Sequence, residues 1–329
     1  MPVRETRRRS RGFLGRLLSP RILVSAIVSL AIIAALLSLV DLGKLATLLA
    51  RLRPAYVAAA LLLILAYNAV QSLQWMFLLD HLGIVGPRRD ELLAFVGANL
   101  TKYLPGGSYF QNYLLYETSG IDPALSSVAT TLMVLLEPAV ALIFLLIIGV
   151  DGWIWLRWLL AIGLPLALLF AAGVYVFIES PNLPRWVTDR RLYVALADEV
   201  VRFREGLSRI AHPRILGATV SLTAVFVLLE ALALYMVARA LHIDGLSVTG
   251  ALGAYYFSIG VALVIPIFTN LGTLEAGGVA ALIALRISSE GAVAIMVLDR
   301  ALIIVVAIVL VLVTSVAFRD LLGRALRAA

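Results

Sequence analysis

The sequence contains no cysteine in 329 residues and only three histidines. Without cysteine, a disulfide framework and a thiolate metal site are excluded. No two of the histidines, His81, His212 and His242, have metal-ligand spacing, so we expect neither a metal nor another cofactor. A Walker loop, a dinucleotide fingerprint and a Gly-x-Ser-x-Gly motif are also missing, which leaves ATP-driven and hydrolytic chemistry without support.

Charged residues are scarce as well, at 14% of the chain, whereas 62% of the residues are hydrophobic and the mean hydropathy is +1.01. Soluble domains are roughly one-quarter charged and about half apolar. The net charge of +7 comes from basic residues beside apolar runs, where membrane topology and anionic bilayer lipids explain them better than nucleic acid does. We therefore expect an all-α integral membrane protein with no nucleic-acid partner.

Six apolar runs reach the length of about 20 residues that crosses a bilayer, namely 22–41, 55–80, 124–150, 154–178, 214–240 and 291–317. The basic residues before the first run resemble the start of a signal peptide, but the run is too long and no small-x-small cleavage site follows. We interpret it as an uncleaved first helix. The chain then comprises a basic segment 1–21, a single membrane domain 22–317 and a basic tail 318–329.

Two further apolar stretches, 91–119 and 249–287, are interrupted by turn-forming or polar residues. The first break is Lys102-Tyr103-Leu104-Pro105-Gly106-Gly107, and the second contains Pro266 and Thr269-Asn270-Leu271-Gly272. Each arm is too short to cross a bilayer unaided, so we predict two re-entrant hairpins. The alternative is that each stretch forms two complete spans, which gives ten spans and no re-entrant loop.

The placement of lysine and arginine predicts the orientation of the spans. With a cytoplasmic N-terminus, the inner side receives the arginines of 1–21, 88–89, 185–214 and 319–327, and the outer side receives Lys44, Arg51 and Arg53. We therefore expect a multi-pass protein of the cell membrane with both termini in the cytoplasm. The two hairpins then enter from opposite sides, and the halves 22–150 and 154–317 form an inverted repeat, as in many secondary transporters.

Segment 185–212 has apolar residues at helical spacing with arginines between them. Such an amphipathic helix is suited to lie on an anionic cytoplasmic leaflet. The alternative is a connecting helix that packs on the bundle.

The two breaks are the candidate sites for a lipid phosphate. At the first break Pro105 ends one arm, and a new helix starts near Ser108, where free backbone N–H groups and the helix dipole favour a phosphate. A simple helix break is the alternative. The predicted phosphate-binding residues are Lys102, Tyr103, Pro105, Gly106, Gly107, Ser108, Asn112 and Tyr113 at the first break, and Asn270, Gly272 and Thr273 at the second.

Ionisable residues within the apolar segments are a second signal, because each costs about 2.5–3.5 kcal/mol at the bilayer centre. The predicted cavity charges are Glu117, Glu137, Glu230, Glu275 and Arg300. Pro138 loosens the helix beside Glu137, and we hypothesise that this carboxylate faces Lys102 or Arg300. A static buried ion pair is the alternative, and Glu275 is equally well explained as a helix cap.

The motifs Thr101–Ser108, Glu137, Pro266–Ala276 and Arg300 resemble those of the transmembrane, flippase-like region of lysylphosphatidylglycerol synthases, over about residues 20–317. The resemblance implies movement of a lipid between leaflets, either an aminoacylated phosphatidylglycerol or a polyprenyl-phosphate-linked sugar. Many relatives have Gly-Gly in place of Thr269-Asn270 and an arginine where this chain has Gln111 and Asn112, so the headgroup stays open. These 329 residues contain no soluble aminoacyl-transfer domain, and we expect no enzyme activity.

The leading hypothesis is thus a secondary transporter, or flippase, for a lipid with a phosphate headgroup. One alternative is a membrane glycosyltransferase that uses a polyprenyl-phosphate sugar, with Glu117 or Glu275 as the base. Another is an accessory subunit for a partner glycosyltransferase or synthase.

Overall fold

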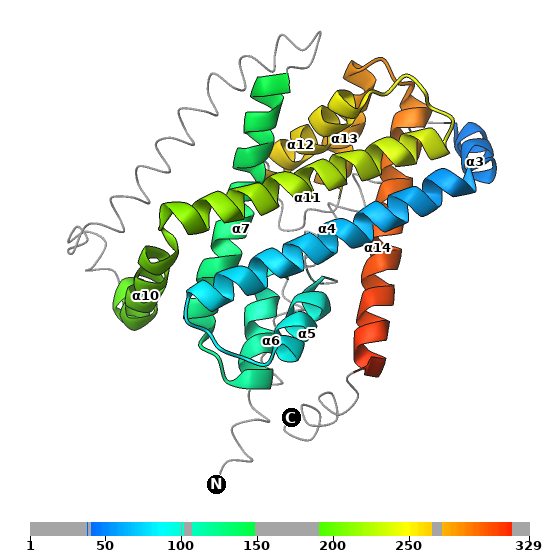
Figure 1. The fold of residues 1–329 in the computed structure, drawn as a ribbon. Helices are drawn as coiled ribbons and strands as arrows, with labels where there is room; N and C mark the ends of the chain where they lie inside the picture. Colours follow the sequence, from blue (N-terminus) through cyan, green and yellow to red (C-terminus); the bar gives the residue numbers. More distant parts are fainter. Residues whose placement is uncertain are drawn as a thin grey trace. The chain divides into compact units, whose positions relative to one another are not determined.

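The computed structural model describes residues 38, 41–99, 101, 107–148, 191–264 and 272–317. All regular elements in these ranges are helical, as Figure 1 shows. Their order along the chain is α3 (Leu42–Ala50), α4 (Pro54–His81), α5 (Arg88–Ala98), the short 3₁₀ helix η1 (Gly107–Tyr109), α6 (Phe110–Ser119), α7 (Pro123–Ile148), α10 (Arg191–Ile210), α11 (Pro213–Ala240), α12 (Val248–Val264), α13 (Thr273–Ala284) and α14 (Ser289–Ala317).

Four of these helices are long and apolar enough to cross a membrane, over Pro54–His81, Pro123–Phe144, Pro213–Ala240 and Ser289–Thr314. They confirm the second, third, fifth and sixth predicted spans to within a few residues. The predicted spans 22–41 and 154–178 lie outside the described residues, except for Ser38 and Asp41.

The starts of the long helices follow from local sequence. Proline is the first residue of α4, α7 and α11, where its fixed φ suits a helix and its missing N–H is not needed. Asp122 also caps α7, since its carboxylate accepts a hydrogen bond from the N–H of Ala124 at 2.9 Å. Ser288 caps α14 through a 3.2 Å bond from the N–H of Gly291. Each span therefore has a start signal in the residues themselves.

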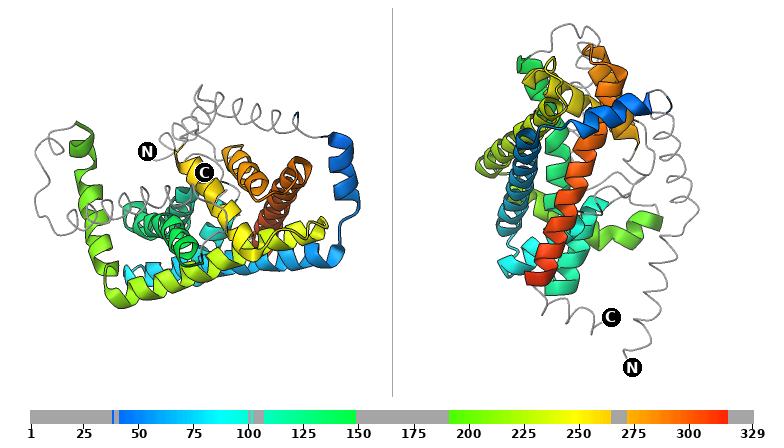
Figure 2. Two further views of the ribbon diagram at one scale, coloured as in Figure 1. Left: turned by 90° about the horizontal axis from the view of Figure 1, so that it is seen from above. Right: turned by 90° about the vertical axis from the view of Figure 1, so that its right-hand side faces the viewer.

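The described helices divide between two compact units. Unit 1 contains residues 1–64, 96–110 and 232–329, and unit 2 contains 65–95 and 111–231. In unit 1, α12, α13 and α14 lie side by side and α3 contacts α14 (Figure 2). A Cβ on Gly277 would lie 2.9 Å from the Cα of Ser258, so α12 and α13 approach closely only because residue 277 lacks a side chain.

The core of unit 2 surrounds Trp75, Phe95, Leu115 and Val128, which are all almost completely buried. The helix α10 packs on α7 at Gly206, whose hydrogen faces Leu125 and Val128. Within this unit Gln74 of α4 donates hydrogen bonds to Thr223 Oγ1 at 2.8 Å and to the carbonyl of Thr219 at 3.2 Å. A buried side-chain amide thus joins the two long helices α4 and α11.

The two halves of the chain share the same order of elements. A long helix, two shorter helices with a break between them and a second long helix occur as α4–α7 and again as α11–α14. The turns after α4 and α11 also match, since Leu82-Gly83-Ile84 and Leu241-His242-Ile243 both place the middle residue at positive φ, 78° and 61°. In each turn the isoleucine N–H bonds back to the helix at 3.0 Å, which is the hydrogen bond of a Schellman cap.

The turns before α7 and α14 correspond as well. Gly120 and Arg286 both have positive φ, 68° and 64°, and an isoleucine follows each of them. Counting equally from these residues aligns Asn112 and Thr130 with Gly278 and Met296. Both aligned pairs are in contact, the first through a hydrogen bond and the second through the methionine side chain that covers the glycine. The similarity of the two halves therefore extends to the register in which these helices pack.

Candidate functional site

The second break ends at Gly272, which has φ 88° and precedes the first residue of α13. Three residues into the helix, Glu275 folds back over this start. Its Oε2 accepts a hydrogen bond from the N–H of Gly272 at 2.6 Å. The carboxylate therefore satisfies a backbone donor that the break leaves open and compensates the positive end of the helix dipole.

The other oxygen of Glu275 binds an arginine of the last span. Arg300 of α14 donates through its Nε to Oε1 of Glu275 at 2.7 Å, and the two side chains are 16% and 10% exposed. Asp299, the neighbour of Arg300, is also buried. A pair this well shielded offsets the cost of placing each charge in an apolar helix bundle. The start of α13 is thereby linked to the interior of a membrane span.

Of the residues predicted at the second break, Gly272, Thr273 and Glu275 lie together and are all buried. Asn270 and Pro266 lie outside the described residues. The capping function weighed for Glu275 is present, and so is a charged partner, Arg300. Both residues are predicted from the sequence as cavity charges, but their pairing is not.

At the first break, Lys102, Tyr103, Pro105 and Gly106 lie outside the described residues. On either side of them the chain is held by Thr101, whose hydroxyl lies 2.8 Å from the carbonyl of Ala98 and 3.1 Å from that of Gly107. Gly107 is buried in η1, and Ser108 is half-buried. The two arms therefore end close together, as a hairpin tip requires.

Within unit 2, buried amides of α6 meet a threonine of α7. Gln111 Nε2 donates to Thr130 Oγ1 at 2.8 Å, and the same hydroxyl donates to Asn112 Oδ1 at 3.1 Å. Gln111 and Asn112 are 3% and 2% exposed, and Asn112 Nδ2 has no hydrogen-bond partner among the described residues. A buried donor without a partner costs about 1–3 kcal/mol, so this position is suited to a polar ligand group or water.

The predicted site residues of α6 therefore divide between two faces of the helix. Asn112 faces the interior, whereas Tyr113 and Glu117 are exposed. Thr130, which joins the buried amides, was not identified from the sequence. A threonine within an apolar helix gives no sign of its hydrogen-bond partners in the sequence, because these come from α6 and are met only when α6 and α7 pack together.

Two more of the predicted cavity charges lie within long helices. Glu137 is half-buried directly before Pro138 in α7, and Glu230 is buried in α11. Of the two partners proposed for Glu137, Lys102 lies outside the described residues and Arg300 donates to Glu275, so the pairing of Glu137 stays a prediction.

One end of unit 2 gathers a set of loops, here called the unit 2 loop cluster and defined as residues 82–91, 119–123 and 202–212. Arg88 binds Asp80 at 2.5 Å and Glu91 at 3.1 Å. Burial raises the pKa of Glu91, and the guanidinium of Arg88 opposes this shift. The side chains of Arg88 and Asp80 stand at the edge of a mainly apolar cavity of about 460 Å³ that α4 and α5 line.

The helix α10 is the described part of the predicted amphipathic segment, and it joins the same cluster. Arg202 binds Asp122 at 2.8 Å, and Arg209 donates to the carbonyl of Leu82 at 3.0 Å. Phe203 and Leu207 pack against the unit 2 core. These contacts favour the connecting helix that packs on the bundle, at least for the second half of α10.

A comparison with protein families gives one match over most of the chain. The sequence model for the lysylphosphatidylglycerol synthase TM region matches residues 22–311, which include nearly all the described helices. No curated protein matches the chain. The resemblance drawn from the two breaks and the charged residues is confirmed.

Proposed function

Because the chain belongs to the family of lysylphosphatidylglycerol synthase transmembrane regions, we propose that it is a secondary transporter for a phosphate-containing lipid. The family match supports a multi-pass membrane domain with a lipid-related function. The lipid headgroup crosses the membrane between the two helix breaks, and its acyl chains stay in the bilayer. An aminoacylated phosphatidylglycerol and a polyprenyl-phosphate sugar are the two substrate classes that we propose to test.

The observation that carries this proposal is the buried Glu275–Arg300 pair at a helix break within the membrane domain. A protein that only anchors itself in lipid has no need for such a pair, because charged groups there are costly and apolar residues pack at least as well. Buried ionisable groups beside interrupted helices typically mark a transport pathway.

The two breaks have different roles in this proposal. At the second break, the carboxylate of Glu275 already accepts the hydrogen bond from the N–H of Gly272. An incoming phosphate therefore meets a negative charge there. We therefore assign the phosphate contacts to the first break, with Lys102 as the cation and Asn112 Nδ2 as a buried donor. At the second break, Arg300 can exchange the carboxylate of Glu275 for the headgroup during transport.

Contacts between loops and helix ends within each unit support the proposed topology. The unit 2 loop cluster connects the end of α4 to the start of α5, contains the start of α7 and connects α10 to α11, and the arginine bias places all these ends in the cytoplasm. In unit 1 the carbonyl of Ala240, at the end of α11, accepts a hydrogen bond from the N–H of Arg53 at 3.0 Å. Lys44 of α3 also binds Glu290 at the start of α14. These ends are all predicted to face outward.

The lengths of the interrupted helices favour re-entrant hairpins over complete spans. The helices α5 and α6 have 11 and 10 residues, and α12 and α13 have 17 and 12. A helix rises about 1.5 Å per residue, so all four are shorter than the roughly 30 Å hydrocarbon layer. With the recurring turns, these lengths support an inverted repeat whose halves rock to expose the site alternately.

A leaflet-exchange assay tests this proposal. The protein is reconstituted into vesicles with fluorescent phosphatidylglycerol, lysyl-phosphatidylglycerol or polyprenyl phosphate, and outer-leaflet fluorescence is quenched chemically. We expect exchange at least tenfold faster than in empty vesicles for one lipid, and loss of this acceleration in Glu275→Gln. Arg202→Gln, which breaks an exposed ion pair, is the matched control. No acceleration for any of these lipids would overturn the proposal.

The alternative function is a glycosyltransferase, and the exposure of Glu117 on α6 is the observation that favours it. Glu275 is already engaged as a cap and an ion-pair partner, so Glu117 is the better candidate base. Vesicles that contain a polyprenyl-phosphate sugar and an acceptor would then yield a covalent product that Glu117→Gln abolishes.

A further inference from the structure

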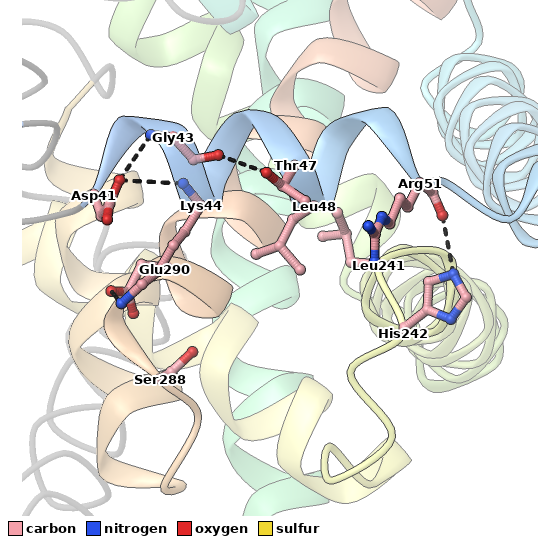
Figure 3. A pocket seen from close by; sticks show the side chains of 10 residues that line it. All are labelled: Asp41, Gly43, Lys44, Thr47, Leu48, Arg51, Leu241, His242, Ser288 and Glu290. Carbon is pink, nitrogen blue, oxygen red and sulfur yellow. Dashed lines mark hydrogen bonds and ion pairs between the residues drawn. The ribbon is translucent and has the colours of Figure 1, made fainter.

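Unit 1 contains a cavity of about 1030 Å³ that none of the roles above uses. Figure 3 shows its lining residues, which come from three places in the sequence. The helix α3 covers one side, the turn after α11 forms another, and the start of α14 closes the third. The lining residues are Asp41, Gly43, Lys44, Thr47, Leu48, Arg51, Leu241, His242, Ser288 and Glu290.

Hydrogen bonds hold α3 in place over this cavity. Asp41 caps the helix by accepting from the N–H groups of Gly43 and Lys44 at 2.8 and 3.2 Å. At the other end, His242 Nε2 lies 2.9 Å from the carbonyl oxygen of Arg51. A carbonyl only accepts, so Nε2 carries a proton and donates this bond. Asp41 thus stabilises the helix start itself, whereas His242 and the Lys44–Glu290 ion pair tie α3 to the other walls of the cavity.

The charges around the cavity are unevenly matched. Lys44 faces Glu290 at 3.4 Å. Outside the cavity lining, Arg53 and Arg239 share Asp244, at 3.8 and 2.7 Å. Arg51 has no carboxylate partner in the described part of the chain. In Figure 3 its guanidinium points from the end of α3 toward Leu241. The carboxylate of Asp41 also lines the cavity, where it caps α3. Among these described residues, four cations thus stand against the three carboxylates of Asp41, Asp244 and Glu290, which leaves one excess positive charge around the cavity.

The location makes this cation unusual. The outer side of a membrane protein is depleted of lysine and arginine, and the cations predicted to lie there are Lys44, Arg51 and Arg53. All three gather at this corner of unit 1, beside Arg239. Cations concentrated where few are expected indicate attraction for an anion.

We propose that this cavity is a binding site for a phosphate group, supplied by the headgroup of an outer-leaflet lipid. Arg51 binds the phosphate oxygens through two N–H groups, a geometry that suits the planar guanidinium. Lys44 adds a second cation, because its ion pair with Glu290 is long and solvent-exposed and so is easily exchanged. Leu48, which is half-buried at the cavity wall, contacts the glycerol backbone, for which the volume leaves ample room.

The outward orientation of the site rests on the proposed transporter topology, whereas the binding itself does not. Within that topology the cavity holds the headgroup where it leaves or enters the outer leaflet, apart from the helix breaks. It therefore gives the transporter a second contact with the same lipid.

Native mass spectrometry of the full-length protein tests the proposal. Phosphatidylglycerol is titrated onto the detergent-purified protein, and the bound fraction is compared between wild type, Arg51→Gln and Arg51→Lys. We expect about a tenfold weaker apparent affinity for Arg51→Gln, because a charge-assisted hydrogen bond is typically worth about one factor of ten in binding. Arg51→Lys retains the charge and recovers part of the binding.

The matched control is Arg286→Gln. This exposed arginine belongs to the same unit and is absent from the cavity lining, so its loss lowers the net charge equally. Equal binding by wild type and Arg51→Gln, or equal weakening in Arg286→Gln, would overturn the site.

Competition identifies the source of the phosphate. If millimolar inorganic phosphate leaves the phosphatidylglycerol adduct intact, the ligand is a lipid. If it removes the adduct and binds in its place with the same Arg51 dependence, the phosphate site stands and a free anion occupies it. If the wild type binds lipid through Arg51 but does not speed leaflet exchange, the transporter proposal is refuted and this site stands. If it speeds exchange but binds lipid independently of Arg51, this site is refuted and the transporter proposal stands.

Discussion

Replacing Glu275 by glutamine should destabilise the protein more than any single change at its exposed ion pairs. The substitution leaves Arg300 partly buried without its counter-charge and weakens the bond to the N–H of Gly272. Removing one member of a buried pair costs about 3–5 kcal/mol, and the retained amide oxygen recovers part of this as an acceptor. We expect a loss of about 2–4 kcal/mol.

The assay is thermal unfolding of the detergent-purified protein, followed by the fluorescence of its tryptophans. For a chain of this size about 1 kcal/mol corresponds to roughly 2 °C in Tm, so Glu275→Gln should lower Tm by about 4–8 °C. The double variant Glu275→Gln with Arg300→Met removes both charges. It should be more stable than Glu275→Gln alone, because the guanidinium that lost its carboxylate partner is also removed, while Asp299 stays buried in both variants.

This reasoning predicts a specific non-additivity. The two single variants should each be less stable than the double variant. If Glu275→Gln shifts Tm by less than about 1 °C, or if the two losses simply add, the pair is not a buried, coupled ion pair and the argument for its role in transport fails.

Three further outcomes follow from the packing and the buried polar groups. Gly277→Val should cost about 1–3 kcal/mol in a thermal unfolding assay because α12 and α13 are forced apart, whereas Gly260→Ala, with open space around it, should be near neutral. Thr130→Val removes the partner of two buried amides and should cost about 2–4 kcal/mol, while Thr130→Ser stays close to wild type by the same measurement. The raised pKa of Glu91 means that its folded form holds the proton more tightly, so stability falls as pH rises from about 4.5 through the folded pKa, and Glu91→Gln should flatten a Tm–pH curve over that window.

The sequence predicts the long helices well because their signals are local. Pro54, Pro123 and Pro213 each begin a span, and the apolar runs behind them set the length. The breaks are equally visible, since proline and glycine interrupt runs that are otherwise apolar. The helix α3 was not predicted as a separate helix. Its local signal is Asp41, which forms an N-cap pattern before Leu42.

The partners of charged residues are much harder to predict. Glu137, Glu275 and Arg300 were all recognised, because a charge in an apolar run is conspicuous. Which of them meet depends on how α13 packs against α14, and that contact is set by small residues such as Gly278 rather than by the charges themselves. The same limit hid Thr130 and the cavity under α3, since both arise from segments far apart in the sequence.

The central claim is that two helix breaks enter the membrane from opposite sides, and the absence of native cysteine makes it directly measurable. Ser108→Cys and Leu274→Cys each introduce one half-buried thiol beside a break, and a membrane-impermeant maleimide is applied to right-side-out and to inside-out vesicles. We predict that Ser108→Cys reacts only from the cytoplasmic side and Leu274→Cys only from the outer side in the resting protein. Labelling of both from the same side, or of neither from any side, would contradict the account.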